Sequence, residues 1–362
     1  MQFASILAPA RRLPRTSFST LAFSLVLAAA ALWQPARAQS GGDDVLLQMK
    51  QASQRGDKAR LSALLPQARG HALEPWAAYW ELKARLGESS TQEVQDFLAR
   101  YAGTYQEDRM RNDWLLLAGQ RRDWDSFSSL HPAYRMNDDA QVSCYAILVE
   151  TLRSGTASQA QADEVRRHWF AQRDLDDGCL TAADRMIGAR LMSPNDAWKK
   201  ARLAIEANRP QAARAAVMLV APDAIALFDE MNANPAKFLA GRATAVAKSR
   251  RELVVLALIK MTVADPGVAA AQLEGKWDTT LSTEERNWLW GAIGRQFATK
   301  LSPLAGSYFA NVTKLGDLTD DMLAWKARAA LRTGSWKDVQ AAVDAMRVAQ
   351  QLFAFSILYL FL

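Results

Sequence analysis

Histidine and cysteine are scarce in this chain. Its 362 residues include three histidines, His71, His131 and His168, and two cysteines, Cys144 and Cys179. None of the histidines stands at metal-ligand spacing from a cysteine, which argues against a zinc site. No histidine arrangement around either cysteine indicates a catalytic thiol. The sequence therefore predicts neither a metal nor a cofactor.

Common catalytic signatures are also missing. The sequence contains no H-E-x-x-H, no G-x-S-x-G, no Walker A loop and no G-x-G-x-x-G. These gaps argue against zinc peptidases, serine hydrolases of the nucleophile-elbow type, P-loop enzymes and dinucleotide-binding folds. No catalytic or cofactor-binding residue is predicted.

Convincing strand alternation is absent, whereas helix signals recur along the chain. Ser90 and Glu93 have the spacing of a capping box, as do Ser282 and Glu285. Ser193 stands as a cap residue before a first-turn proline. Apolar residues follow each of these starts at helical spacing. We therefore expect an all-α chain.

Short turns interrupt the alanine-rich helices. They lie at 55–57, 119–123, 208–210 and 333–335, and the closest pair runs from Ala118 to Trp124 and from Ala330 to Trp336. Such a degenerate helix–turn–helix repeat cannot bury the apolar face of one hairpin alone. Neighbouring hairpins are therefore expected to stack as one continuous array over residues 45–346.

The N-terminus has the pattern of a secretory signal peptide over residues 1–38. Basic residues lie at 11, 12 and 15, an apolar run covers 21–33, and Ala36-Arg37-Ala38 precedes Gln39. The apolar run is too short to span a bilayer comfortably, which disfavours an uncleaved anchor. We expect cleavage after Ala38, a disordered leader over 39–44, and export to the periplasm.

Charge and cysteine usage fit an exported protein. The chain has 44 basic and 38 acidic residues, and removing four arginines with the signal peptide leaves 40 against 38. This small excess gives no support for nucleic-acid binding. In an exported protein, the pair Cys144 and Cys179 is expected to form a structural disulfide.

The last residues, 347–362, form an apolar tail unlike the charged helices before them. A helix of this length is too short to span a bilayer, so no stable membrane span is predicted, although a tail-anchored protein is an alternative. A buried last helix would need partners on every side. We expect an aberrant end produced by truncation or a frameshift.

Tryptophan, arginine and acidic doublets are the remaining candidates for function. Trp76, Trp80 and Trp114 fall at helical spacing among Leu and Ala and are expected in the core, whereas Trp290 is expected to face differently from Trp288 and to be exposed. Arginine pairs at 109/111, 121/122, 166/167 and 250/251 have acids nearby, which favours solvated helix faces. On the inside of a curved solenoid they would attract an anionic polymer.

Acidic doublets at 138/139, 176/177, 284/285 and 320/321 are expected to cap helices rather than to form a glycosidase pair.

Several segments resemble the soluble lytic murein transglycosylases. These are Leu73-Glu74-Pro75-Trp76-Ala77-Ala78-Tyr79-Trp80-Glu81-Leu82, Phe97-Leu98-Ala99-Arg100-Tyr101, the positions Arg109, Arg111, Asp113-Trp114-Leu115 and Gly119, and the hairpin from Trp325 to Trp336. The signal peptide and the cysteine pair fit the same family. The resemblance covers roughly residues 45–346.

The resemblance implies a right-handed α-superhelix of stacked hairpins, U-shaped and exposed to the periplasm. It also implies a partner in peptidoglycan strands and a separate catalytic domain, which cleaves the MurNAc–GlcNAc bond with a 1,6-anhydro product. The acid of that domain is a Glu in a Glu-Ser context followed by Gly-Leu-Met-Gln. Here the one Glu-Ser is Glu88-Ser89, with no such stretch behind it, so no catalytic residue is carried over.

Two functions follow as hypotheses. The first is the superhelical domain of a truncated periplasmic lytic transglycosylase, acting in peptidoglycan turnover and inactive by itself. The alternative is a non-enzymatic helical-repeat scaffold that binds proteins or murein strands in the periplasm. The DNA beyond codon 362 distinguishes them, since a reading frame with a Glu-Ser motif would favour truncation.

Overall fold

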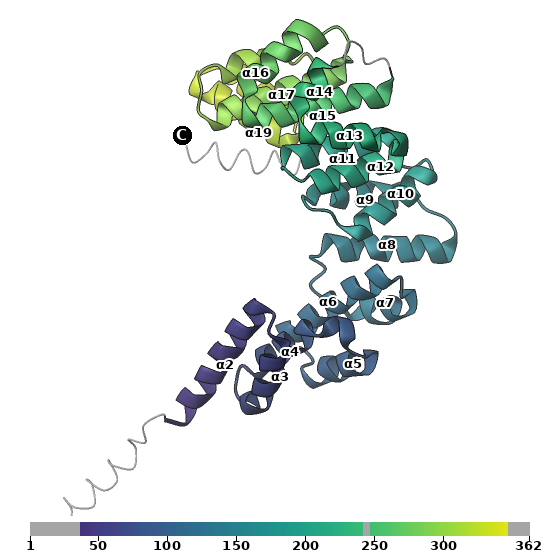
Figure 1. Cartoon of the computed structure of the whole chain (residues 1–362), viewed down its shortest axis with the longest axis vertical. Coiled ribbons are helices and arrows are strands. Elements are labelled where there is room, and N and C mark those ends of the chain that lie inside the picture. Colours follow the sequence, from purple (N-terminus) through teal and green to yellow (C-terminus); the bar gives the residue numbers. More distant parts are fainter. Residues whose placement is uncertain (1–36, 242–246, 347–362) are drawn as a thin grey trace, which may run out of the picture. The chain divides into compact units, whose positions relative to one another are not determined.

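The computed structural model describes residues 37–241 and 247–346, and all of its regular elements are helical (Figure 1). No strand occurs in these ranges. The predicted all-α class is therefore confirmed. The signal peptide predicted for 1–38, apart from Arg37 and Ala38, and the tail predicted for 347–362 lie outside the described residues.

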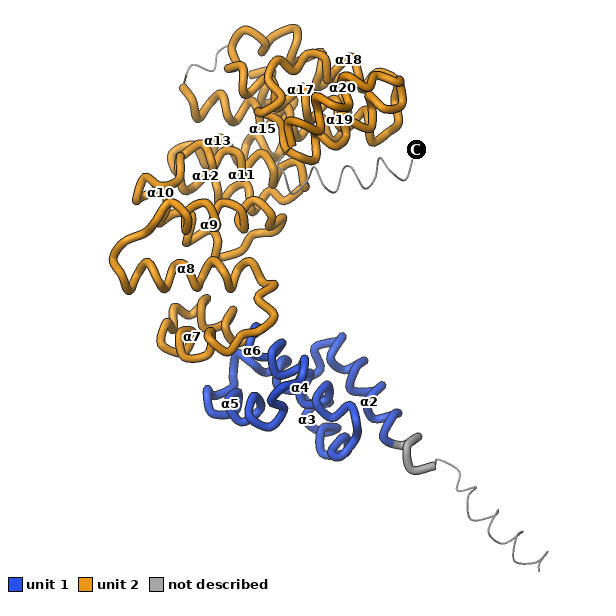
Figure 2. Tube along the Cα trace, turned by 180° about the vertical axis from the view of Figure 1, so that it is seen from behind, with its two compact units in different colours: residues 1–113 blue, residues 114–362 orange. Residues whose placement is uncertain are grey.

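The chain divides into two compact units, residues 1–113 and 114–362, coloured separately in Figure 2. The boundary falls within helix α6 (Tyr105–Arg121). We expected one continuous array over 45–346, and whether the two units form one array stays a prediction.

Unit 1 contains short helices that follow one another closely. They are α2 (Arg37–Arg55), α3 (Lys58–Leu64), η1 (Leu65–Ala68), α4 (Glu74–Ala84), η2 (Leu86–Glu88), α5 (Thr91–Arg100) and the first part of α6 (Tyr105–Arg121). Helices α2, α3 and α4 pack on one another. Their shared core consists of Val45, Leu46, Met49, Ala52, Leu61, Leu64, Ala68 and Ala77.

Helix α2 includes residues 39–44, where the sequence suggested a disordered leader. The backbone there is helical instead. Asp43 bonds the ring of His71 at 2.9 Å, and Gly42 lies close against the same ring. His71 therefore holds this end of the helix, a contact that comes from 28 residues further along the chain.

Unit 2 contains the remaining described helices. They are the end of α6, α7 (Trp124–Leu130), η3 (His131–Ala133), α8 (Ala140–Ser154), α9 (Gln159–Ala171), α10 (Asp177–Gly188), α11 (Pro194–Glu206), α12 (Pro210–Val220), η4 (Pro222–Ala224), α13 (Ile225–Ala233), α14 (Pro235–Ala240), α15 (Lys248–Ala264), α16 (Pro266–Gln272), the π-helical turn η5 (Leu273–Trp277), α17 (Thr283–Thr299), α18 (Ala305–Ala310), η6 (Leu315–Asp317), α19 (Asp320–Arg332) and α20 (Trp336–Asp344).

Hairpins and central helices make up the packing of unit 2. Sequential partners such as α11 with α12 and α19 with α20 lie against each other, and α15 and α17 each contact several helices. In α15 every residue from Glu252 to Ile259 is buried. A helix buried on all sides needs neighbours on all sides, so α15 is a central element of the unit.

The predicted turns share one backbone geometry. At four of them an alanine carbonyl accepts the N–H five residues later, and the residue before that N–H has a positive φ. The bonds are Asp57 to Ala52 (2.9 Å), Asp123 to Ala118 (2.9 Å), Arg209 to Ala204 (2.8 Å) and Ser335 to Ala330 (3.0 Å). The positive-φ residues are Gly56, Arg122, Asn208 and Gly334. This is the hydrogen bond of a Schellman C-cap, and it confirms the helix–turn–helix repeat.

The predicted helix starts are confirmed as well. Capping boxes form at Ser90 with Glu93, at Ser193 with Asp196 and at Ser282 with Glu285. A further box, Ser158 with Gln161, was missed in the sequence, although it follows the same spacing with glutamine in place of glutamate.

Candidate functional site

Three of the segments that carry the family resemblance come together on α4, α5 and α6 of unit 1, whereas the hairpin from Trp325 to Trp336 lies in unit 2. Glu74, the first residue of α4, accepts the Gly70 N–H at 2.7 Å, the Tyr101 hydroxyl at 2.9 Å and the Arg100 guanidinium at 2.5 Å. The hydrogen bond from Gly70, aided by Tyr101 and Arg100, lowers the pKa of Glu74. Burial and the bond to Glu74 raise the pKa of Tyr101 to about 12. Glu74 is thus held as a carboxylate that joins α4 to the end of α5.

A second polar contact joins α4 to α6. The Tyr79 hydroxyl donates to Asp113 at 2.8 Å, and the Lys83 ammonium contacts the other oxygen of the same carboxylate. Burial and the charge of Asp113 raise the pKa of Tyr79. Partial burial lowers the pKa of Arg109, but the hydrogen bond with Tyr79 and the charge of Asp113 outweigh it, so the pKa of Arg109 is raised. Arg109 therefore stays charged beside Tyr79.

Three rings from these helices form an aromatic patch, which we define as Trp76, Trp80 and Tyr105. The ring of Trp76 lies 5.8 Å from that of Trp80 and 5.7 Å from that of Tyr105, both tilted. It also meets the buried Tyr79 edge-on at 5.9 Å. Trp80 packs on the core of unit 1, whereas Tyr105 is 54% exposed and Trp76 half-buried. Trp80 therefore anchors the patch to the core, while Tyr105 and part of Trp76 are open to solvent.

The patch combines ring surface with nearby cations. Arg100, Lys83 and Arg109 come from the same three helices, and the first two have side chains about half exposed. Amphipathic aromatic rings provide apolar contact area, and arginine binds carboxylates well. This chemistry suits a saccharide with acidic substituents. It does not suit general acid catalysis, because the nearby Glu74 is held ionised and Asp113 is paired with Lys83.

Other tryptophans belong to the core. Trp114 is 4% exposed, as predicted. The expectation that Trp290 would be exposed is wrong, since it is 5% exposed and its ring lies parallel to that of Tyr308 at 6.2 Å. Both Trp288 and Trp290 are buried because α17 packs against α15, α18 and α19 at once. Trp336, the first residue of α20, is 56% exposed.

In the acidic doublets, one residue typically caps a helix while its neighbour contacts another side chain. Asp139 caps α8, Asp176 caps α10 and Glu285 caps α17. Their neighbours contact other side chains: Asp138 accepts from Tyr134, Asp177 pairs with Arg122, and Glu284 pairs with Arg202. In the fourth doublet, Asp321 pairs with Arg295. Adjacent residues thus point apart, as the sequence predicts, and one of each of the first three caps a helix.

The arginine pairs lie near acids, as expected. Arg166 pairs with Asp196 at 3.2 Å and Arg167 with Glu164 at 3.2 Å. Arg251 pairs with Glu285 at 3.5 Å. Arg111 departs from the solvated helix face, because it is 8% exposed and paired with Glu107.

The Glu88-Ser89 dipeptide does not supply an acid catalyst. Glu88 is exposed and pairs with Lys58, whose hydrogen bond and charge lower the pKa of Glu88. Ser89 is buried and donates to the Arg85 carbonyl at 3.1 Å. A general acid in glycoside cleavage needs a raised pKa, which is the opposite of what is found.

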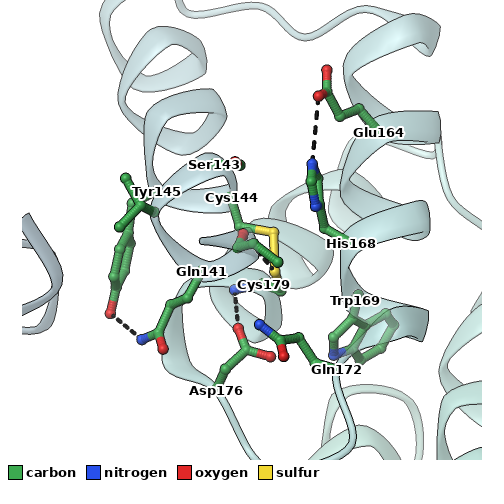
Figure 3. Close-up of a disulfide and its surroundings, with 12 residues drawn as sticks. Gln141, Ser143, Cys144, Tyr145, Glu164, His168, Trp169, Gln172, Asp176 and Cys179 are labelled. Atoms are coloured by element: carbon green, nitrogen blue, oxygen red, sulfur yellow. Dashed lines mark hydrogen bonds and ion pairs between the residues drawn. A yellow bond between two sulfur atoms is a disulfide. The ribbon is translucent and has the colours of Figure 1, made fainter. Parts of the chain in front are cut away.

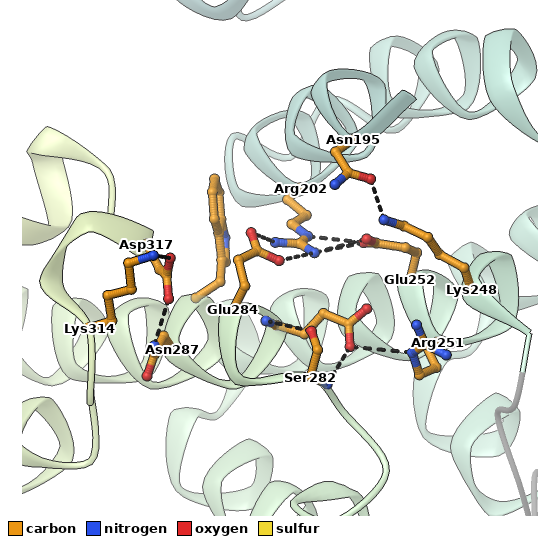
Figure 4. A network of polar contacts seen from close by, with 12 residues as sticks. Asn195, Arg202, Lys248, Arg251, Glu252, Ser282, Glu284, Asn287, Lys314 and Asp317 are labelled. Carbon is orange, nitrogen blue, oxygen red and sulfur yellow. Dashed lines mark hydrogen bonds and ion pairs between the residues drawn. The ribbon is translucent and has the colours of Figure 1, made fainter. Parts of the chain in front are cut away.

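A buried charge network joins α11, α15 and α17 (Figure 4). The Arg202 side chain is 1% exposed and donates to Glu252 at 3.0 Å and to Glu284 at 2.8 Å. One turn later, Glu206 accepts the Trp288 indole N–H at 2.7 Å and pairs with Arg295 at 3.1 Å. Burial raises the pKa of both Glu206 and Glu252. Because every carboxylate here has a basic partner, we interpret the network as a structural one.

The two cysteines are joined in unit 2. Cys144 on α8 and Cys179 on α10 form a disulfide with their Cα atoms 4.9 Å apart, and both are fully buried (Figure 3). Asp176 accepts the Cys179 N–H at 2.6 Å, and burial raises the pKa of Asp176. The bond connects the helices on either side of α9.

Within 37–241 and 247–346, no three His, Cys, Asp or Glu side chains gather in a way that could hold a metal ion. In the same ranges each helix is either too short or too polar to cross a lipid bilayer.

Comparison with known proteins gives structural neighbours. No protein-family model matches the chain, and neither does any curated protein. Among solved structures it is similar to the lytic transglycosylase Slt from Pseudomonas aeruginosa, solved as an inactive mutant, with 23% identity, a TM-score of 0.48, and coverage of 86% of this chain and 52% of that one.

Two further structures are similar to the chain. One is the 70 kDa soluble lytic transglycosylase from Escherichia coli, with 13% identity, a TM-score of 0.44, and coverage of 85% and 50%. The other is a 70 kDa soluble lytic transglycosylase in complex with bulgecin A, with 13% identity, a TM-score of 0.43, and the same coverage. The chain spans about half the length of each of these three structures.

Proposed function

We propose that this chain is the helical module of a periplasmic lytic transglycosylase and acts in peptidoglycan turnover by holding glycan strands. In this proposal the chain reaches the periplasm through its signal peptide. Cleavage of the glycosidic bond belongs to a separate catalytic domain, and residues 45–346 cleave nothing by themselves.

One observation carries the proposal. Segments 73–82, 97–101 and 109–113, which resemble the transglycosylase family, converge on three neighbouring helices, where Trp76 and Trp80 of the first segment form the aromatic patch with Tyr105. Peptidoglycan offers saccharide rings for the exposed surfaces of Trp76 and Tyr105. Its acidic groups would meet the cations of Arg100 and Arg109.

A sedimentation assay with purified murein sacculi tests the binding. The chain should pellet with sacculi, and the double variant Trp76→Ala/Tyr105→Ala should bind at least about tenfold more weakly, since each stacked ring contributes about 1–3 kcal/mol. Trp336→Ala is the matched control, because it removes an exposed ring in the other unit. Thermal melts confirm that each variant folds.

The outcome that contradicts the proposal is equal pelleting of the wild type, the double variant and the control, or no pelleting at all. Equal losses in the patch variant and the control would indicate general stickiness of exposed rings rather than a site.

A second assay tests the division of labour. Murein digested with the purified chain should yield no 1,6-anhydro-muropeptides by mass spectrometry. Their appearance would show that the chain cleaves by itself, and that outcome would overturn the separate catalytic domain.

A further inference from the structure

A groove of about 650 Å³ lies in unit 2 and shares no residue with the aromatic patch. Helices α8 and α10 and the turn between α6 and α7 form its walls. The lining residues used below are Arg122, Trp124, Leu148, Leu152, Asp184 and Arg185.

Arg122, which lines this groove, has a strained backbone conformation. It has a φ of 60°, a conformation that costs a side-chain-bearing residue roughly 1–2 kcal/mol. Among the other turns with this geometry, the position is Gly or Asn at three, and Arg190 and Leu301 occupy it at two more. The role of Arg122 therefore follows from its side-chain contacts rather than from the backbone conformation alone.

The Arg122 guanidinium supports the wall of the groove. It forms a two-pronged pair with Asp177, donates to Thr181 at 3.1 Å, and lies 5.7 Å over the ring of Trp124. Its two terminal nitrogens are therefore occupied and its position is fixed. Arg122 holds the Trp124 side of the groove in place and leaves binding to other groups.

Arg185 is fixed but its charge is not compensated. Its Nε donates to the Thr151 hydroxyl at 3.2 Å and its Nη2 to the Thr151 carbonyl at 3.1 Å, and both partners are neutral. Among the carboxylates of the described ranges, none forms an ion pair with it. An oriented guanidinium with free donors matches the geometry of a carboxylate.

The other lining residues narrow the class of ligand. Leu152 is 45% exposed beside the buried Leu148 and offers an apolar contact. Asp184 is exposed and supplies an acceptor for an N–H group, while its charge disfavours a multiply charged phosphate or an anionic polymer. The groove thus presents one cation, one acceptor and one apolar wall.

We propose that this groove binds the end of a short peptide that has a small aliphatic side chain and a free C-terminal carboxylate. The carboxylate accepts from Arg185, an amide N–H donates to Asp184, and the side chain contacts Leu152. The inference goes beyond the proposed function, because nothing in it requires a glycan strand.

The test uses the synthetic peptide N-acetyl-Ala-Ala and the same peptide with its carboxylate converted to an amide. The ¹⁵N-labelled full chain is titrated with each, and the NMR signal of the Trp124 indole N–H is followed. We expect saturable shifts with the free acid and binding on the order of tenfold weaker for the amide, because the charge-assisted contact to Arg185 is lost.

Variants locate the site. Arg185→Gln should weaken binding of the free acid to the level of the amide, whereas Arg214→Gln, which breaks an exposed pair with Asp229, should leave it unchanged. If Arg185→Gln melts early, Leu152→Glu decides the matter, since it places a negative charge at an exposed position of the same groove.

Three outcomes would overturn the proposal: equal binding of acid and amide, no saturable shift with either peptide, or free-acid binding that survives the decisive variant. The assay contains no murein, so its result is independent of the sedimentation experiment.

Discussion

Single buried charges tie the helices of unit 2 together, and Arg202 is the most deeply placed of those described above. Replacing it with alanine would leave Glu252 and Glu284 without their cation. Removing one partner of a buried pair costs about 3–5 kcal/mol. We expect Arg202→Ala to lose an amount of this order in the free energy of unfolding measured with urea.

The matched control is Arg214→Ala, whose pair with Asp229 is exposed at both ends. An exposed pair contributes about 0–1 kcal/mol. Similar losses in the two variants would show that the Arg202 network contributes no more than a surface pair.

Lys200 offers a pH-dependent test at the same scale. Its ammonium is buried and donates to the carbonyls of Trp169 and Gln172 at 2.5 Å, and burial lowers the pKa of Lys200 to about 8. Between pH 8 and the higher pKa of an exposed lysine, the unfolded chain keeps a proton that the folded chain has released. Stability must therefore rise with pH in that window.

The measurement compares the wild type with Lys200→Met from pH 8 to pH 10. The free energy of unfolding of the wild type should increase relative to that of Lys200→Met as the pH rises. A constant difference would mean that Lys200 titrates normally in the folded chain. The other titratable groups are the same in the two proteins, so their contributions cancel in the difference.

At the scale of elements, close approach between helices explains why certain glycines stand where they do. A Cβ on Gly294 of α17 would come within 2.8 Å of the Phe309 ring of α18, whereas Gly306, also on α18, has no neighbour within 4 Å. Gly294→Ala should therefore destabilise by about 1–3 kcal/mol. Gly306→Ala should stabilise by about 0.5–1 kcal/mol.

Thermal melts of the two variants check this pair. Opposite shifts of the melting temperature are expected. A shift in the same direction for both would contradict the tight contact between α17 and α18.

Sequence reasoning succeeded for elements whose signals are local. The hairpin turns and the capping boxes at Ser90 and Ser282 depend on residues within about six positions of one another, so the sequence predicts them directly. Trp290 was misjudged because its burial depends on which helices cover both sides of α17. Tyr105 was missed because it joins Trp76 through a contact between two helices, which neither segment encodes alone.

At the scale of the whole molecule, the disulfide constrains one unit and not the other. Cys144 and Cys179 are the only cysteines of the chain and both lie in unit 2. Closing a loop of this length stabilises a protein by about 2–4 kcal/mol. Reduction should therefore raise amide hydrogen exchange in α8, α9 and α10.

Hydrogen exchange followed by mass spectrometry, before and after reduction, tests this expectation. Helices α2 to α5 should exchange at unchanged rates, which provides the internal control. Faster exchange throughout the chain would show that the two units lose structure together. No change anywhere would show that packing alone maintains this region.

The hairpin turns have a consequence for how such a protein can vary over generations. What defines each bend is a main-chain bond to an alanine, and the side chain at its left-handed position is glycine in two cases, asparagine in another and arginine in the fourth. A turn defined by a backbone hydrogen bond tolerates substitution at almost every position around it. Proteins that share this architecture can therefore diverge until little sequence identity remains, while the path of the backbone stays the same.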